Sequence, residues 1–431
     1  MRSLSPLIVF LVLYLVTSLL LRDFYSVPIA VAFLLSAVYA LLATRGRLAD
    51  KLDAFTRGAG EPTMQLMLLI FILSGAFAAS AKAMGAVEST VNLTLSLLPQ
   101  QLLLPGVFLA SCFISFSIGT SCGTIAALTP VAVGIAEAAG MSVLLMLGLV
   151  VGGTYFGDNL SFISDTTIIA TQTQGCNMRD KFRTNVRIVL PVALLLLAVY
   201  YVMGLRTETA VSIGRFEAIK LLPYLCVIGS ALCGMNVVLV LVLGLACTGV
   251  IGLVWGDFTP LAWLQAMNGG MMGMAELILC TILAGGMLSI IRSQGGIDLI
   301  IRFITRRIRS RRGGEYAIAM IVTLVNVCTA NNTVAIITTG PIARDIALRF
   351  GIDPRRSASI LDTMSCFAQG LLPYGAQVLI AAGLAGVNPV AILPYLYYPA
   401  LIGLAVMLSI AVRKMEDGRW KMEDGKLKIE N

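Results

Sequence analysis

The stretch GTYFGDNLSFISDTTIIATQTQG, residues 153–175, places Asp158 and Asp165 among hydroxyl and apolar side chains of an otherwise oily chain. Of the 431 residues, 58% are hydrophobic and only 13% are charged, and the mean hydropathy is +0.90. This composition leaves too little polar surface to cover a soluble core. Apolar stretches long enough to cross a bilayer recur along the whole chain, so the sequence predicts an all-α polytopic membrane protein.

The charged and reactive residues exclude several other classes of protein. The net charge of +8 would suggest a nucleic-acid partner in a soluble protein, but here the basic residues lie in short loops and indicate membrane orientation. Nine cysteines without a CxxC pair argue against a zinc site or a disulfide framework. The chain has no histidine, so proton transfer within it falls to carboxylates.

The two halves of the chain resemble each other at a nearly constant offset. TSCGTIAALTP from Thr120 aligns with NNTVAIITTGP from Asn331. FGDNLSFISDTTIIA from Phe156 aligns with FAQGLLPYGAQVLIA from Phe367, an offset of 367 − 156 = 211. A third block keeps nearly the same register, so the sequence predicts an internal duplication.

Each copy, residues 1–212 and residues 213–422, is expected to hold about five transmembrane helices, an interfacial helix and a broken stretch. The expected spans are 7–22, 26–43, 64–81, 143–170 and 188–204, and then 219–234, 237–255, 274–291, 357–384 and 390–412. The broken stretches, 104–139 and 316–350, could each be a re-entrant hairpin or two full crossings. All arginine clusters lie on one side of the membrane only if the copies are inverted.

The basic side of this single transmembrane domain is expected to face the cytoplasm. The segment 296–312, GIDLIIRFITRRIRSRR, is amphipathic and basic and suits the cytoplasmic headgroup layer. Its counterpart, residues 86–99, carries no Lys or Arg, as expected on the opposite face. The charged residues 413–431 predict a solvated cytoplasmic tail, and the N-terminus is expected on the same side.

The two broken stretches are candidate binding sites. Backbone that leaves a helix inside a membrane needs polar partners, so a break at this depth indicates a protein-lined or watered cavity. Opened helix ends also present carbonyls and amides to an ion or substrate. The alternative is that small residues here only let helices pack closely. The candidate residues of the two breaks are Thr120, Ser121, Thr124, Asn331, Asn332 and Thr333.

The two aspartates are the candidates for charge transfer. Their spacing of seven residues predicts one face of a single helix, about two turns apart. A carboxylate at mid-bilayer costs about 2.5–3.5 kcal/mol and usually faces a functional interior. The alternative, capping of the SDTT turn, suits Asp165 better than Asp158. We therefore expect Asp158 to exchange Na⁺ for H⁺, with further candidate binding residues Asn159, Ser161, Ser164, Asp165 and, at the matching place in the second copy, Gln369.

Two residues of the second copy stay open to different interpretations. Gln377 adds to the amide side chains of that copy, so the duplicated site is acidic in one half and amide-rich in the other. Asp362 is expected either to cap a helix N-terminus beside the basic loops or to act as a gate.

Three motifs carry a family resemblance: GTSCGT with LTP, FGDNLSFISDTTIIATQTQGCNMRDKFRT, and ARDIALRFGIDPRRSASILDTMSCFAQGLLPY. Over about residues 63–412 the chain resembles the NhaC family of Na⁺/H⁺ antiporters, within the broader ion-transporter superfamily. The resemblance implies an inverted-repeat carrier of bacterial cytoplasmic membranes, in a family that also exchanges organic or amino acids. It implies that Asp158 and Asp165 are the family's acidic positions, and that Thr120, Ser121 and Thr124 form its polar break.

The leading hypothesis is therefore a secondary active Na⁺/H⁺ antiporter, in which the two copies rock about Asp158 and expose it alternately. An alternative is a Na⁺- or H⁺-coupled carrier of a small organic acid or amino acid. A remote alternative, an intramembrane aspartyl protease, needs both carboxyls on one water, whereas residues i and i+7 of one helix rise about 10 Å. We expect no enzyme and no resident cofactor. The expected partners are Na⁺ or Li⁺, protons and the lipid bilayer, and a homodimer is one assembly considered.

Overall fold

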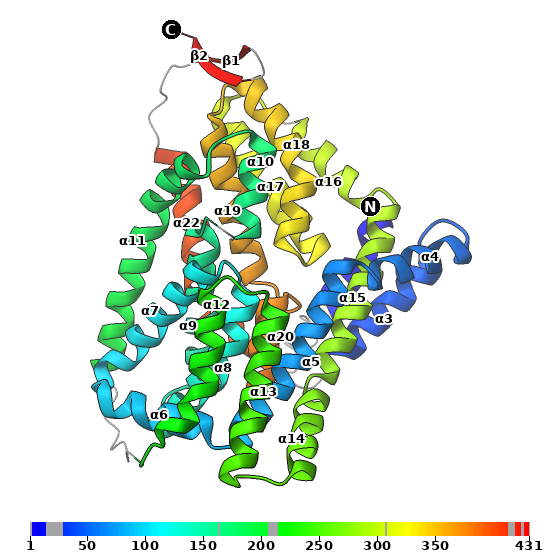
Figure 1. The fold of residues 1–431 in the computed structure, drawn as a ribbon. Coiled ribbons are helices and arrows are strands. Elements are labelled where there is room, and N and C mark those ends of the chain that lie inside the picture. The colour runs from blue at the N-terminus through cyan, green and yellow to red at the C-terminus, as the bar shows by residue number, and fades with distance from the viewer. Residues whose placement is uncertain are drawn as a thin grey trace.

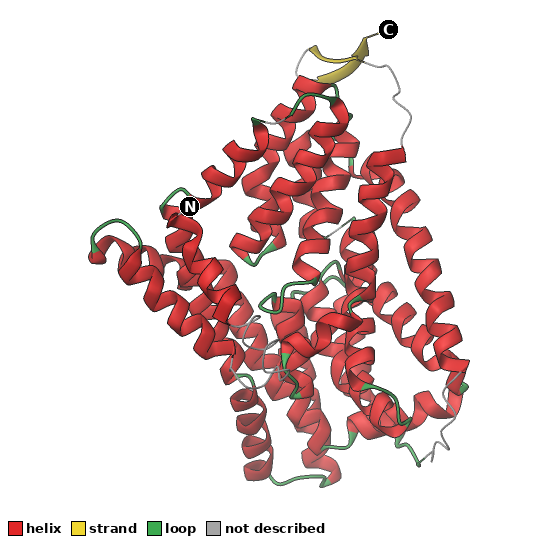
Figure 2. Ribbon diagram, turned by 180° about the vertical axis from the view of Figure 1, so that it is seen from behind, coloured by secondary structure: helices red, strands yellow, loops and turns green. Residues whose placement is uncertain are grey.

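Helices make up nearly all of the membrane part of the protein (Figures 1 and 2). The computed structural model describes residues 2–13, 29–162, 164–205, 214–306, 308–412, 419–423 and 426–430. Within these ranges seven helical stretches are long and apolar enough to cross a membrane, or eight if one bent pair counts as a span. The prediction of an all-α polytopic membrane protein is confirmed, although most of the expected first span, 7–22, lies outside the described residues.

The helices follow one another in a similar order in the two halves. The first half contains η1 (Arg2–Leu4), α1 (Ser5–Leu11), α3 (Ile29–Ala43), α4 (Leu48–Ala59), α5 (Pro62–Ala83), α6 (Ala86–Leu97), η3 (Gln100–Leu102), α7 (Leu103–Ile118), α8 (Ser121–Ala138), α9 (Val143–Leu160), α10 (Asp165–Gln174) and α11 (Met178–Leu205). The second contains η4 (Ala218–Leu221), α12 (Leu222–Leu232), α13 (Val237–Trp255), α14 (Pro260–Gly273), α15 (Ala275–Ser293), α16 (Gly296–Thr305), α17 (Arg311–Thr329), α18 (Asn332–Phe350), α19 (Pro354–Gly370), α20 (Ala376–Ala385), α21 (Pro389–Ile392), η5 (Leu393–Tyr395) and α22 (Tyr397–Val412).

The charged tail holds the strands found in the described part of the chain. β1 (Arg419–Glu423) pairs antiparallel with β2 (Lys426–Glu430), and Arg419 lies opposite Glu430. This hairpin was not expected from the sequence. It lies beyond the last helix at the C-terminal end of the chain, so the membrane part remains helical (Figure 1).

The helices pack into two bundles, each drawn from both halves of the chain. The frame bundle consists of α3, α4, α5, α13, α14 and α15, with α5 against α13 and α14, and α15 against α3 and α4. The core bundle consists of α7–α11 and α17–α22, with α9 against α7 and α8, and α18 against α10, α17 and α19. In Figure 1 the frame bundle occupies the lower right and the core bundle the left and top. The packing boundary therefore does not follow the boundary between the halves.

Both expected broken stretches are broken where the sequence predicts. α7 and α8 are separated by Gly119 and Thr120, and α17 and α18 by Ala330 and Asn331. In Figure 1 the α17–α18 hairpin lies in the upper half of the molecule and α7 and α8 lie in the lower half. Both tips line the same cavity, so the two hairpins meet at one site, and α7 together with η3, as well as α8, is long enough to cross a membrane by length and composition.

The expected continuous helices at 143–170 and 357–384 are wrong. α9 ends at Leu160 and α10 begins at Asp165, while α19 ends at Gly370 and α20 begins at Ala376. Apolar residues on both sides favour one long span, although Ser161 and Ser164 at the first interruption and Pro373 and Gly375 at the second are residues typical of a helix end. Each half therefore has a second break beside its hairpin, and Asp158 and Asp165 lie on two different helices.

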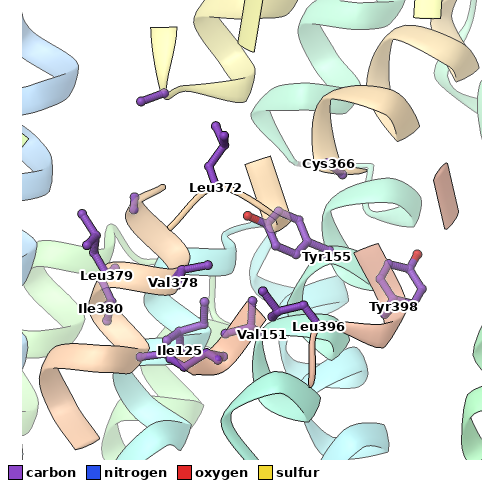
Figure 3. Packing of buried hydrophobic residues seen from close by; sticks show 14 of the residues in the cluster. Ile125, Val151, Tyr155, Cys366, Leu372, Val378, Leu379, Ile380, Leu396 and Tyr398 are labelled. Carbon is purple, nitrogen blue, oxygen red and sulfur yellow. The ribbon is translucent and has the colours of Figure 1, made fainter. Parts of the chain in front are cut away.

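Apolar side chains from both halves hold the core bundle together. Figure 3 shows Val151 of α9 close to Ile125 of α8 and Leu396, which precedes α22. All three side chains are buried. This packing joins α8 and α9 of the first half to the segment before α22 of the second.

Close contact between α5 and α14 in the frame bundle depends on glycine, which allows a test of the fold. A Cβ atom on Gly270 would overlap the backbone carbonyl of Gly75, whereas one on the neighbouring Gly269 would meet no atom within 4 Å. We expect Gly270→Val to separate the helices and destabilise the protein by about 1–3 kcal/mol or more. Thermal unfolding in detergent measures the effect, and Gly269→Val is the matched control. Equal melting temperatures for the two variants would contradict this packing.

Candidate functional site

A cavity of about 140 Å³ lies where the two hairpin tips meet the other two breaks. Its walls come from both halves of the core bundle, and Leu66, Met67 and Ile70 of α5 close it on the side of the frame bundle. The polar residues that line it are Thr120, Ser121, Asp158, Ser164, Asp165, Thr166, Asn331, Asn332, Thr333, Gln369 and Gln377. Of the lining residues that the structure describes, none is Lys or Arg. The cavity is therefore polar, acidic and without a basic side chain.

The hairpin tips reverse through left-handed backbone conformations. Gly119 ends α7 with φ 75°, a conformation that suits glycine, and Thr120 is extended before α8. At the second tip Ala330 has φ 51°, and it is the one non-glycine residue with positive φ in the described ranges. A residue with a Cβ atom in this conformation costs about 1 kcal/mol or more, so the surrounding tip must hold it in place. Asn331 does so in part, because its side chain accepts a hydrogen bond from Val334 N and caps α18.

The two aspartates have different environments. Asp158 lies in the last turn of α9 and is 3% exposed, with the Ser121 hydroxyl of the first hairpin within hydrogen-bonding reach of its carboxylate. Asp165 is the first residue of α10 and is exposed. A carboxylate at that position is stabilised by the positive end of the helix dipole, so Asp165 has a structural explanation. Asp158 has no such structural explanation, because a buried carboxylate at a helix C-terminus faces the negative end of the helix dipole.

Amide side chains line the opposite wall in a fixed orientation. Gln369 Nε2 donates to the Ala330 carbonyl and to Gln377 Oε1, both at 3.1 Å. Gln377 Nε2 in turn donates to Ser121 Oγ at 3.0 Å, which links the two halves across the cavity. The remaining Gln369 oxygen is buried and has no hydrogen-bond partner among the described residues. These hydrogen bonds tie Gln369 and Gln377 to the tips of both hairpins.

The structure brings most of the predicted site residues together, but not all of them. Nine of the twelve candidates line the cavity: Thr120, Ser121, Asp158, Ser164, Asp165, Asn331, Asn332, Thr333 and Gln369. Asn159 points elsewhere, and its amide donates to the Tyr398 hydroxyl at 3.0 Å. Thr124 bonds back to the Thr120 carbonyl within its own helix, and Ser161 is buried outside the lining. Thr166, a lining residue, was missed, because its helix was expected to continue from α9.

Two charged residues near the site do not lie where the sequence suggested, although a gate role for Asp362 stays a prediction. Asp362 does not cap a helix: Asp353 caps α19, and Asp362 lies in the middle of that helix, fully buried. Its partner is Lys181, at 2.6 Å between Nζ and Oδ2. Lys181 is one of the basic residues expected in short loops beside the membrane, yet its side chain is only 1% exposed. Nothing in the sequence distinguishes Lys181 from the other basic residues near it, so its burial could not be predicted.

The comparison with known proteins decides the family. A sequence model described as "Na+/H+ antiporter family" matches residues 2–205 and 221–413, which is most of the chain. The chain belongs to the Na⁺/H⁺ antiporter family. Members of this family are secondary transporters and not enzymes. The remote protease hypothesis is thereby excluded; the helix-distance argument against it does not hold, since α9 and α10 are separate helices.

Relatives in the antiporter family differ in what their names say they exchange. The Na(+)/H(+) antiporter NhaC of Bacillus subtilis is 24% identical, over 82% of this chain and 84% of its own length. The malate-2H(+)/Na(+)-lactate antiporter of the same species is 22% identical over 94% of both chains. The arginine/ornithine antiporter ArcD of Halobacterium salinarum is 23% identical, over 83% of this chain and 79% of its own. The YdaH transporter of Alcanivorax borkumensis, a solved structure, matches with a TM-score of 0.43 and 15% identity, over 84% of this chain and 86% of that one.

Proposed function

We propose that this family member exchanges Na⁺ for H⁺ at Asp158. The observation that carries the proposal is an acidic cavity, without Lys or Arg among its described lining residues, in which one carboxylate is buried at a helix break. Such a carboxylate is neutralised either by a proton or by a cation, and one group that holds only one of them at a time gives obligatory exchange. Hydroxyl and amide oxygens around it suit a hard cation. Na⁺ and H⁺ are cargo in this proposal, and no resident cofactor takes part.

The size of the cavity also favours an ion. Sites for small organic molecules are typically about 300–1,000 Å³, and this cavity measures about 140 Å³. A second candidate cargo is a small organic cation or amino acid with an ammonium group. The amide side chains of Asn331, Asn332 and Gln369 support it, because they line the same cavity as Asp158 and offer hydrogen-bond partners to a polar organic group while the carboxylate holds the ammonium group.

We further propose that residues 1–212 and 213–422 are inverted copies. Support comes from the helix starts: α8 and α18 begin at Ser121 and Asn332, and 332 − 121 = 211, the offset of the sequence blocks. The arginine-rich clusters then lie on one face, which we assign to the cytoplasm together with both termini. The corresponding location is the bacterial cytoplasmic membrane. A homodimer is a further proposal, which comes from the sequence alone.

The packing suggests which parts move. Rocking of one copy against the other would have to divide both bundles, because each bundle is built from both copies. A movement of the core bundle along the frame bundle leaves both intact. The cavity lies between them, with α5 as one wall, so such a movement would open the site to alternate sides.

Transport in proteoliposomes tests the cargo. The purified protein is reconstituted with a pH dye in the lumen and a pH gradient across the membrane. Na⁺, Li⁺, K⁺, arginine and lactate are then added one at a time. We expect Na⁺ or Li⁺ to drive proton movement and lactate to have no effect, since the cavity has no described cation to hold a carboxylate. Proton movement with lactate but with no cation would reject the proposal.

A further inference from the structure

A buried ion pair lies directly behind the break that carries Asp158. Lys181 Nζ is 2.6 Å from Asp362 Oδ2, and the side chains are 1% and 0% exposed. Asn185 Nδ2 donates to the same carboxylate oxygen at 2.9 Å. Lys181 belongs to α11 of the first half and Asp362 to α19 of the second, so the pair joins the two halves inside the core bundle.

The lysine also holds the broken end of α9. Its ammonium group donates to the Asn159 carbonyl at 2.9 Å and to Thr167 Oγ1 at 2.6 Å. Thr167 Oγ1 donates in turn to the Asp158 carbonyl at 3.2 Å. Carbonyls at a helix end have no partner within the helix and must find one inside a membrane. The charge of Lys181 is thus one hydroxyl group away from the backbone of Asp158.

The ion pair has no charged counterpart in the repeated positions of the chain. At the 211-residue offset, Asp362 corresponds to Val151 and Lys181 to Ile392, both fully buried and apolar. Figure 3 shows Val151 of the first half close to Leu396 of the second, among apolar side chains. A buried ion pair is often no more stable than apolar side chains of similar volume. The charges therefore call for an explanation other than packing.

We propose that the Lys181–Asp362 pair sets the electrostatic field at the cation site. The carboxylate of Asp362 attracts a cation and the ammonium of Lys181 repels it, so that together they nearly cancel. Charges in a buried interior act over longer distances than in water, because screening is weak there. Because the two contributions nearly cancel, the binding of a proton or a cation depends on the carboxylate of Asp158 alone. Lys181 and Asp362 are therefore positioning residues for the exchange. This inference rests on the proposed function.

Removing one charge at a time should move the cation affinity in opposite directions. Asp362→Asn leaves Lys181 uncompensated and is expected to raise the KM for Na⁺ about ten-fold, because an unpaired positive charge in the weakly screened interior opposes cation binding. Lys181→Met leaves Asp362 uncompensated and is expected to lower the KM by a similar factor. Its maximal rate should fall as well, because a tightly held cation leaves slowly. Proton movement against Na⁺ concentration in proteoliposomes gives both quantities.

A double variant separates charge from packing. K181I/D362V carries the residues that the other half has at these positions and leaves no unpaired charge. We expect its KM to lie within about two-fold of the wild type, since the net charge behind the site is unchanged. The control pair is Arg356 and Glu315, buried and 3.1 Å apart between α17 and α19, with neither residue in the cavity lining. Arg356→Met and Glu315→Gln should change the yield of folded protein but not the KM.

The sign pattern decides the inference. KM values that shift in the same direction in both single variants, or that stay at the wild-type value, would overturn it. Failure of both single variants to fold, with a double variant that behaves as wild type, would also overturn it, because the pair would then be structural. A wild-type protein that moves no protons with Na⁺ rejects the proposed function instead. The same variants are then measured with arginine as the exchanged cation.

Discussion

Asp158→Asn is expected to abolish cation/proton exchange. The asparagine keeps the size of the side chain and its place beside Ser121 but cannot carry a negative charge. Loss of one member of a buried charge interaction costs about 2–5 kcal/mol, and about 1.4 kcal/mol corresponds to ten-fold. We therefore expect exchange to fall by about 100-fold or more. The measurement is Na⁺-driven proton movement in proteoliposomes, at equal amounts of folded protein.

The control is Asp165→Asn, in the same cavity and only seven positions along the chain. Asp165 is exposed and stabilised by the N-terminus of α10, so its loss should reduce exchange only a few-fold. Equal loss in both variants would show that the two carboxylates act as one unit. Full exchange in Asp158→Asn would remove Asp158 from the mechanism altogether.

The sequence predicts the composition of the site better than its geometry. Small polar residues at Thr120 and Asn331 interrupt apolar runs, and the hairpins break there because extended backbone at depth needs such partners. The second pair of breaks, after Leu160 and after Gly370, also carries local signals: Ser161, Ser164 and Asp165 at the first, and Pro373 and Gly375 at the second. The hydropathy of the flanking residues outweighs these signals, because hydropathy does not distinguish a helix from a buried turn. The predicted face shared by Asp158 and Asp165 failed for this reason, although both still reach one cavity.

Charges in the interior were harder to predict than the breaks. Lys181 lies in the run MRDKFRT, in which every charge is compatible with a loop beside the membrane. Asp362 lies 181 positions further on, and nothing local connects the two. Only the packing of α11 against α19 brings them to 2.6 Å, a contact between the halves that neither half contains by itself. A long-range pair of this kind needs tertiary structure or covariation to be found.

Two cross-links of opposite design are expected to show which bodies move. Both are made in a background without the nine native cysteines. S80C/T248C joins α5 to α13, whose hydroxyl groups at these positions are 2.6 Å apart, so it ties the two halves together within the frame bundle. L277C/G383C joins α15 of the frame bundle to α20 of the core bundle, both in the second half. A Cβ atom on Gly383 would lie 3.5 Å from Leu277 Cγ.

Movement between bundles predicts that the L277C/G383C disulfide stops exchange and that reduction restores it. It also predicts that S80C/T248C transports equally well oxidised and reduced, because its disulfide lies inside one rigid body. Rocking of one copy against the other predicts the reverse for both pairs. The readout is Na⁺-driven proton movement before and after dithiothreitol, with disulfide formation checked by mass spectrometry. Because each cross-link spans only one of the two possible boundaries, the pair of results distinguishes the two movements.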